Sequence, residues 1–521
     1  MRLRSDVSHL LDTNEVPTKI EVATVQNALD SLTGRISTLR SQLERLEEQH
    51  RRHRAILSPV RRIPLEVLAE IFSLVSEPIQ FEYDRETTID LGLVCKSWRA
   101  ATLLAHRLWK GVFFTPDDPP SVYDHIVSRF KKSGNLPKSL EYDVTFNYCE
   151  CSDDVGKACM SRHLALAKLL THGPPLDHFT LVVNSTQCFR EWEDTIGLSS
   201  NRSLRSRPRP WDTLRSFNLI FNANYAGEYE WDNSSDPAES IFFGLPPAIT
   251  SLELCLPPMW ETFAGGEECN RAALNVPPQV LEHLTTFTIR SDWYGTKVLP
   301  MLKHCTNLET LTFDFKFKSP LLSEGSHPLI LLPRLRTLRI RHTPDIDLLR
   351  DLQAPALLHL DLVLCDGELE SADTLIKFLD VSNARPALQS LRIYDLRIPS
   401  DELRLCLSNL PSLKRLTLEK VILENDGPLF TDAYGEDNVT GVSPDLPALE
   451  QLELFGLPYD FSFRGSVDDL GYRVKGRCTL TVSYEDKMRH KYSESALSLL
   501  YCPQKVSVRM IPPFDSEDPA L

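Results

Sequence analysis

The sequence predicts an α/β chain in which a long N-terminal helix and a small helical unit precede an irregular solenoid of short strands. Three observations predict this order: an apolar heptad near the N-terminus, two short amphipathic segments behind it, and a string of aliphatic residues that recurs along the rest of the chain. We expect the strands to form a parallel sheet on the concave face of a horseshoe.

The composition is that of a globular protein, with 42% hydrophobic and 25% charged residues in a chain of 521. A net charge of -15 argues against general binding to nucleic acids or anionic membranes. No apolar run approaches the roughly 20 residues that span a bilayer, and the N-terminus lacks the apolar region of a signal peptide. We therefore expect a cytoplasmic or nuclear protein. The twelve cysteines, several at apolar strand positions, predict buried free thiols.

The first predicted element is a coiled-coil helix over residues 21–58, after a flexible N-terminus at 1–20. From Val22 to Leu57, apolar residues and two histidines alternate three and four apart, and Pro59 ends the pattern. Most of the positions that flank this stripe are uncharged, so they do not specify a partner. Two interpretations stay open: the helix self-associates, or it packs on the chain's own body. An arginine-rich run at its end fits either nuclear import or a solvated helix end.

The second predicted element is a helical unit over residues 59–114. Pro64 suits the first turn of a helix, where a missing N–H costs nothing. Two segments then carry apolar residues at helical spacing, and Leu108 and Trp109 close the unit. A unit this small buries little surface alone, so its broad apolar faces predict a partner as well as an internal core.

Within this unit, short motifs resemble the F-box signature in order, spacing and residue type. The lead-in at 57–62 is similar to that of many fungal F-box proteins. Ile63 stands where leucine is usual, and the connector between the two helical segments is longer than in most members. The matching residues are Ile63-Pro64, Glu66, Val67-Leu68, Ile71-Phe72, Val94-Cys95-Lys96-x-Trp98-Arg99 and Leu108-Trp109.

The resemblance implies that the unit docks on a Skp-family adaptor, which links it to the cullin scaffold of an SCF-type ubiquitin ligase. The same apolar residues could instead form only the core of a three-helix cap, and one face can serve both roles. The residues that the resemblance assigns to adaptor binding are Ile63, Pro64, Leu65, Leu68, Ile71, Phe72, Val75, Leu91, Val94, Cys95, Trp98 and Trp109.

The third predicted element is a repeat array over residues 130–511. The string L-x-x-L-x-L recurs, and its last two apolar residues share one face of a strand. One strand and a return segment per period resemble the leucine-rich-repeat family, although only Cys365 matches that family's Asn/Cys position. Weaker strands are expected at Leu140/Tyr142, Leu480/Val482 and Val506/Val508. The strings are Leu176/Phe179/Leu181, Leu214/Phe217/Leu219, Ile249/Leu252/Leu254, Leu284/Phe287/Ile289, Leu308/Leu311/Phe313, Leu335/Leu338/Ile340, Leu357/Leu360/Leu362, Leu388/Leu391/Ile393, Leu413/Leu416/Leu418 and Leu449/Leu452/Leu454.

Strand alternation also predicts which side chains face outward. The fifth place of each string would align across neighbouring strands, and so would the seventh. These rows are either ordinary cross-strand pairs or a surface that binds a target protein. The target-binding candidates are Arg339, Asp361 and Arg392 in the fifth place and Arg341, Tyr394, Glu419 and Phe455 in the seventh.

The sequence contains no nucleotide-binding, hydrolase or zinc-protease motif and no paired C-x-x-C, so we expect neither enzyme activity nor a cofactor. Cys149, Cys151, Cys159 and His163 cluster, but their spacing fits no common zinc pattern. The acidic segment 421–463 reads as a solvated loop or as a site for a basic partner, and 512–521 as a disordered tail. The predicted function is that of a non-catalytic substrate receptor with an unknown target. The alternative is a cullin-independent scaffold.

Overall fold

The computed structural model describes residues 14–75, 90–145, 159–197, 209–222, 231, 240–246, 248–257, 274–291, 293, 295–315, 329–343, 346–368, 372–407, 410–424, 446–457, 474, 476–484 and 506–510. Most of the N-terminus predicted to be flexible, the connector of the helical unit, most of the acidic segment and the tail lie outside these residues. The described residues form two compact units, one up to Ala105 and one from His106 onward.

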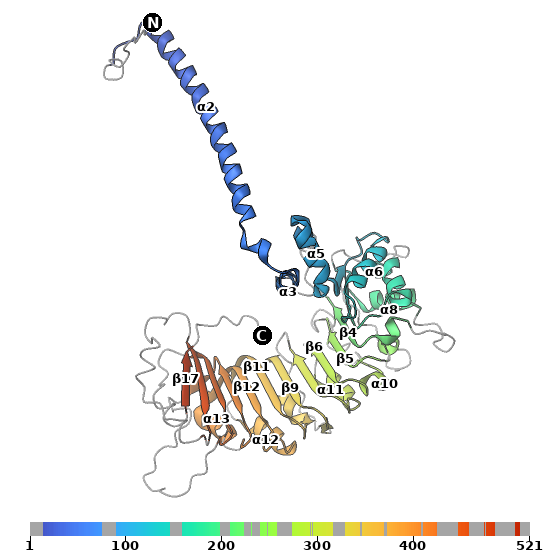
Figure 1. Cartoon of the computed structure of the whole chain (residues 1–521). Coiled ribbons are helices and arrows are strands. Elements are labelled where there is room, and N and C mark those ends of the chain that lie inside the picture. The colour runs from blue at the N-terminus through green and yellow to red at the C-terminus, as the bar shows by residue number, and fades with distance from the viewer. Residues whose placement is uncertain are drawn as a thin grey trace, which may run out of the picture. The chain divides into compact units, whose positions relative to one another are not determined.

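The long N-terminal helix is confirmed. Helix α2 (Lys19–Ile56) is uninterrupted over 38 residues (Figure 1). It begins two residues before the predicted start because Thr18 forms a capping box: its Oγ1 accepts from the Glu21 N–H at 3.4 Å, and its own N–H donates to Glu21 Oε2 at 2.7 Å. The helix ends ahead of the 3₁₀ turn η1 (Pro59–Arg62). No residue of α2 is buried, and its heptad stripe is exposed except at the half-buried Val25.

Two further helices complete the first unit. Helix α3 (Leu65–Val75) packs against α5 (Lys96–Leu104), and residues 90–94 are also helical. Cys95 begins α5 as its N-cap, with its sulfur accepting from the Trp98 N–H at 3.5 Å. The buried residues of this pair are Leu68, Ala69 and Phe72 from α3 with Ala101, Thr102 and Ala105 from α5 and its end.

The second unit is built on a 15-stranded sheet in which every recorded strand pair is parallel. Its path follows the sequence from β1 to β17, as the colours of Figure 1 show from β4 onward. The strands on the path are β1 (Gly111–Phe114), β2 (Ser139–Asp143), β3 (His178–Val183), β4 (Ser216–Phe221), β5 (Ser251–Cys255), β6 (Thr286–Arg290), β7 (Thr310–Asp314), β9 (Thr337–Thr343), β11 (His359–Glu368), β12 (Ser390–Pro399), β13 (Arg415–Glu419), β15 (Gln451–Leu457), β16 (Cys478–Tyr484) and β17 (Val506–Met510).

Three short strands lie off this path. Strand β14 (Ile422–Glu424) pairs with the end of β12, while β8 (Ile330–Leu331) and β10 (Leu352–Gln353) form a separate pair. Helices connect the strands and bury residues in the same core. They are α6 (Val122–Lys132), α7 (Leu164–His172), α8 (Thr186–Thr195), α10 (Pro278–Leu281), α11 (Gly295–Leu302), α12 (Asp373–Val381) and α13 (Ser400–Leu407), with 3₁₀ turns η4 (Trp211–Thr213), η5 (Ile241–Gly244) and η6 (Asp347–Asp351). The 3₁₀ turn η2 (His106–Trp109) precedes β1.

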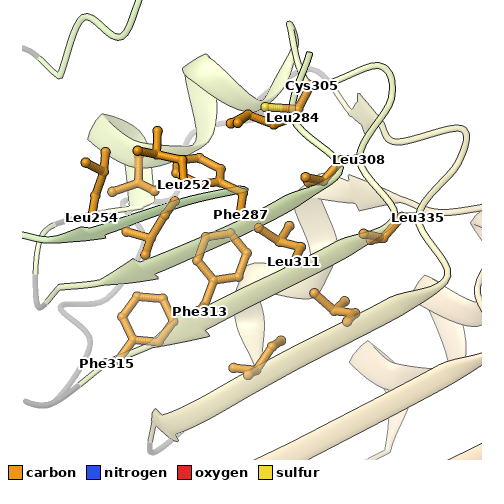
Figure 2. Packing of buried hydrophobic residues seen from close by; sticks show 14 of the residues in the cluster. Leu252, Leu254, Leu284, Phe287, Cys305, Leu308, Leu311, Phe313, Phe315 and Leu335 are labelled. Carbon is orange, nitrogen blue, oxygen red and sulfur yellow. The ribbon is translucent and has the colours of Figure 1, made fainter. Parts of the chain in front are cut away.

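The repeated strings build the core. All their apolar residues are at most 4% exposed, and each string ends in a strand of the sheet. Figure 2 shows Leu252, Phe287 and Leu311 side by side on neighbouring strands, with Leu284 and Leu308 just ahead of their strands. Because the same spacing recurs in each strand, equivalent residues share a face and stack along the sheet. The predicted strands are thus confirmed, including the weaker ones at β2, β16 and β17.

Two details differ from the sequence-based expectation. The sheet begins earlier than residue 130, because residues 111–114 form β1. Cys365 is exposed, and Leu364 is buried and pairs with Thr343 instead. Strand β9 has an extra left-handed residue, His342, between Arg341 and Thr343, whereas in β11 Leu364 follows Val363 directly. Counting along the sequence of β11 therefore places the inward-facing residue one position too late.

Candidate protein-interaction sites

The first candidate site is the surface of the α3–α5 pair. The rings of Phe72 and Trp98 lie with centroids 4.9 Å apart and planes inclined by 55°, which ties the two helices together. Around this contact the predicted adaptor-binding residues divide by exposure, and nothing is described of the Val75 side chain. Leu68 and Phe72 are buried; Ile63, Leu65, Leu91 and Trp98 are half-buried; Pro64, Ile71, Val94 and Cys95 are exposed.

The exposed part of this surface is strongly apolar. Ile71 is 40% exposed and Val94 60% exposed. Large apolar exposure on a small unit is a feature of interaction surfaces, which makes this surface a candidate site. The predicted adaptor-binding residues lacked five of these exposed aliphatic residues, because the prediction followed a single helical face; for those in α3, the nearly continuous apolarity of the helix was the available signal. The exposed aliphatic residues are Val67, Ile71, Leu74, Leu93, Val94, Leu103 and Leu104.

Trp109 has a different environment from the other adaptor-binding candidates. It lies in η2 of the second unit, with Lys132 Nζ 4.1 Å and Arg129 Cζ 5.4 Å from its ring centroid. Arg129 also donates to the carbonyls of Leu108 at 2.7 Å and Gly111 at 3.0 Å. The ring therefore anchors α6 beside the first strand of the sheet.

The second candidate site is the polar face of the sheet, opposite the leucine core. The expected alignment of fifth and seventh places is confirmed by the strand register. A third-place row, which sequence reasoning did not single out, runs beside them. The fifth-place row is Glu253, Thr288, Thr312, Arg339, Asp361, Arg392, Thr417 and Glu453; the seventh-place row is Arg290, Asp314, Arg341, Val363, Tyr394, Glu419 and Phe455; the third-place row is Ser251, Thr286, Thr310, Thr337, His359, Ser390, Arg415 and Gln451.

Ion pairs connect the central part of these rows. Arg392 bridges Glu419 (Nη2–Oε2, 3.0 Å) and Asp361 (Nη1–Oδ1, 3.7 Å), and Arg341 Nη2 lies 3.9 Å from Asp361 Oδ2. Burial raises the pKa of Asp361, and the nearby arginines act in the opposite direction. Glu419 is buried beneath Arg392. The structure therefore brings four of the seven target-binding candidates into one network.

A similar pair of contacts lies toward β6 and β7. Arg290 Nε is 3.0 Å from Glu253 Oε1 and 3.6 Å from Asp314 Oδ2. The other oxygen of Asp314 lies 2.6 Å from His342 Nδ1. His342 follows the seventh place and has a φ of 56°, in the left-handed region. The buried carboxylate of Asp314 thus has basic groups on two sides.

Tyr394 has a basic partner of its own. Lys420 Nζ donates to the Tyr394 hydroxyl at 3.0 Å, and this hydrogen bond is the main cause that raises the pKa of Lys420. Lys420 directly follows a seventh-place residue and has a positive φ, and the same holds for Asp395 and Gly456. Sequence reasoning missed Lys420 and His342 because strand alternation does not predict a left-handed residue at the strand end.

The described residues include neither a metal-binding cluster nor a membrane-spanning helix. They contain no group of three or more His, Cys, Asp or Glu side chains that could hold a metal ion. Within the predicted Cys/His cluster, Cys159 contacts Ser161 at 2.9 Å and His163 Nε2 lies 2.9 Å from the Asp118 carbonyl oxygen, while Cys149 and Cys151 lie outside the description. None of the helices in the described ranges is both long and apolar enough to cross a bilayer.

No protein-family model and no curated protein matches the sequence. The two surfaces are therefore the basis for assigning a function.

Proposed function

We propose that the chain is a non-catalytic substrate receptor of an SCF-type ubiquitin ligase. The F-box-like unit would dock on a Skp-family adaptor, the adaptor would join it to the cullin, and the polar face of the sheet would capture a target protein. The observation that carries the proposal is the exposed aliphatic surface around Phe72 and Trp98, in a unit whose motifs resemble the F-box.

We further propose that the sheet belongs to an irregular leucine-rich-repeat solenoid, with the parallel strands on the concave face of a horseshoe. Two features support this. The strands pair in sequence order, and each repeated string supplies one strand and its buried leucines. Such an array leaves the polar rows free to contact a partner.

The two roles of the small unit divide between neighbouring residues. Leu68 and Phe72 are buried and hold the helices together, whereas Ile71 and Val94 are exposed and would meet the adaptor. A charge introduced at either exposed position would be buried without a partner in a docked complex, and this would weaken binding strongly. In the free chain the same charge would remain in water at little cost.

Co-purification with a Skp-family adaptor tests this division. We expect Ile71→Asp with Val94→Asp to abolish adaptor retention while the circular dichroism spectrum stays unchanged. Leu164→Asp is the matched control: it also places an acid on an exposed leucine, in the first turn of α7, where a helix tolerates acids. Retention by the double variant, or absence of retention by the unsubstituted chain, would refute the F-box assignment.

Cysteine labelling gives a second readout on the same chain. Cys95 and Cys365 are both exposed cysteines, one on the proposed adaptor surface and one on β11. Adaptor binding should slow alkylation of Cys95 and leave that of Cys365 unchanged. Equal Cys95 labelling with and without a bound adaptor would place the docking surface elsewhere.

A cullin-independent scaffold is the second candidate. The exposed heptad stripe of α2 favours it, because an apolar seam of this length suits association with another helix, including that of a second copy. Cullin in the adaptor complex would support the ligase. A complex that retains the adaptor and never cullin would support the scaffold.

A further inference from the structure

Charges on the polar face of the sheet differ in depth. In each ion pair of this face the basic side chain is the more exposed partner. The side chain of Arg290 is 41% exposed, compared with 12% for its partner Asp314. The side chain of Arg392 is 24% exposed, compared with 5% for its partner Glu419. The acids therefore lie beneath the cations that they pair with.

The outermost residues of the face follow the same rule. Within the three rows of the described strands β5 to β15, the exposed positions are Arg339, His359, Arg415 and Gln451, and none of them is acidic. Lys420, just beyond the seventh-place row, is also exposed. A chain with a net charge of -15 thus presents a local cationic surface here.

Arg339 stands out at the centre of this surface. Among the described residues it has no ion-pair or hydrogen-bond partner, although it lies in register beside Asp361. The Asp361 carboxylate already has Arg341 and Arg392 nearby, at distances of 3.9 and 3.7 Å that are too long for hydrogen bonds. Its buried Oδ1 and the buried Nε of Arg341 have no hydrogen-bond partner within the described part of the chain.

We propose that the centre of the polar face, from Arg339 to Arg415, binds an acidic segment of the target protein. This inference rests on the proposed receptor function and specifies its partner. Carboxylates or phosphates of that segment would pair with the outward guanidinium groups, whose planar forks match both anions in two-point contacts. The underlying acids hold some of the arginines in place, which lowers the ordering cost of binding.

The sheet geometry sets the spacing of the anions. Arg339 lies in β9 and Arg415 in β13, with β11 and β12 between them. Parallel strands are about 4.8 Å apart and Arg415 lies two residues back from the row of Arg339, so the two Cα atoms are about 16 Å apart, a gap that their long side chains can narrow by several Å. An extended peptide advances about 3.3 Å per residue, so two acidic residues four positions apart would reach both.

Peptide binding to the full chain tests the inference by fluorescence anisotropy. The probes are short labelled peptides in which three serines separate two glutamates, two phosphoserines or two glutamines. We expect the two anionic probes to bind, the glutamine probe not to bind, and affinity to fall between about 0.15 M and about 0.5 M salt. The stronger of the anionic probes identifies whether the surface selects carboxylates or phosphates.

Three variants locate the binding. Arg339→Gln should weaken the anionic probes by about three- to tenfold, as expected for the loss of one charged contact. Adding Arg415→Gln should weaken them further. Lys377→Gln is the matched control, because Lys377 is an exposed cation on α12, which packs on the leucine core rather than the polar face. The fold should survive Arg339→Gln, because that exposed side chain forms no ion pair or hydrogen bond with the described residues.

Equal binding of the glutamine probe, or unchanged affinity in both arginine variants, would overturn the inference. Adaptor retention and Cys95 protection use the other unit, so they report the receptor function independently. Anionic probes that bind a chain without adaptor affinity would support the acidic-segment site and reject the ligase role.

Discussion

Phe72 and Ile71 are adjacent in α3, yet Phe72 is 2% exposed and packs on Trp98 whereas Ile71 is 40% exposed. One residue therefore belongs to the core of the helical unit, and the next belongs to its surface. In the proposed receptor, this difference would separate folding from docking within a single helical turn.

The first prediction concerns the stability of this unit. Phe72→Ala should cost about 3 kcal/mol or more, because it removes a buried ring and leaves a cavity, while Ile71→Ala should cost less than about 1 kcal/mol. Amide hydrogen exchange of α3 and α5 is the measurement. Similar protection in the two variants would show that Phe72 does not hold the helices together.

The second prediction concerns the ion pairs of the sheet. Arg392→Ala removes the cation above buried Glu419 and should destabilise the second unit by about 2–3 kcal/mol. Arg339→Ala should change stability by less than about 0.5 kcal/mol, because its side chain is exposed and has no ion pair in the described residues. Urea unfolding compares the two. Equal losses would mean that the pairing in the sheet contributes little.

The third prediction concerns pH. Burial, with a smaller effect of Asp143, raises the pKa of Glu141 from 4.5 to about 7. The Glu141 carboxyl therefore binds its proton more tightly in the folded chain than in the unfolded chain. Its contribution to the free energy of unfolding is fully present below about pH 4.5 and is lost as the pH rises to about 7. Glu141→Gln should be about 1–2 kcal/mol more stable than the unsubstituted chain at about pH 8, after allowance for partial solvent screening, with little difference near pH 4.5.

Urea unfolding at a series of pH values measures this effect. Asp373→Asn, on the exposed side of α12, is the control. Asp177→Asn would be unsuitable, because the Asp177 carboxylate accepts a hydrogen bond from the Lys138 N–H. A stability difference for Glu141→Gln that does not change with pH would mean that this carboxyl titrates normally.

The fourth prediction concerns the cysteines. Burial raises the pKa values of Cys305 and Cys406 to about 12, so neither forms a thiolate in the folded chain near neutral pH. Among the cysteines that the structure describes, iodoacetamide at about pH 8 should label Cys95 and Cys365 first and should reach Cys305 and Cys406 only in denaturant. Peptide mapping by mass spectrometry follows each site. Early labelling of Cys305 would show that its surroundings open readily.

The fifth prediction concerns α2. If its heptad stripe pairs with that of a second copy, Leu32→Glu with Leu39→Glu should convert a dimer into a monomer. Ser37→Glu with Ser41→Glu adds the same charge away from the stripe and should not. Sedimentation velocity distinguishes the two. A monomeric unsubstituted chain would leave self-association without support.

The strands were predictable from the sequence for a physical reason. Three apolar residues at a constant spacing both locate a strand and choose its buried face, and the same spacing in every strand aligns the rows. Thus the neighbours of Asp361 could be named from the sequence alone. The pairing of β8 with β10 could not, because two-residue strands carry no periodicity.

Other features depend on tertiary contacts that a periodicity does not contain. The spacing of α3 identifies an apolar helix but not which of Ile71 and Phe72 is covered. Likewise, Cys365 matches a family position by counting, whereas the backbone of β11 places Leu364 there. The sequence also did not predict that Arg415 and His359 are exposed. Strand alternation predicts which face of the sheet a side chain lies on, but not how exposed it is on that face.

Among the described strands, which pair in sequence order, the first and last of the path are β1 and β17, at opposite ends of the second unit's sequence. Truncation at most points between them removes a contiguous set of strands and costs the last retained strand one neighbour, whereas cuts between β8 and β10 or between β12 and β14 also break the β8–β10 or β12–β14 pair. The cost of shortening the chain should therefore come less from lost stability than from a newly exposed edge, whose unpaired N–H and C=O groups invite aggregation. Shortened forms would keep their fold best when a charged residue or proline is placed on the new last strand.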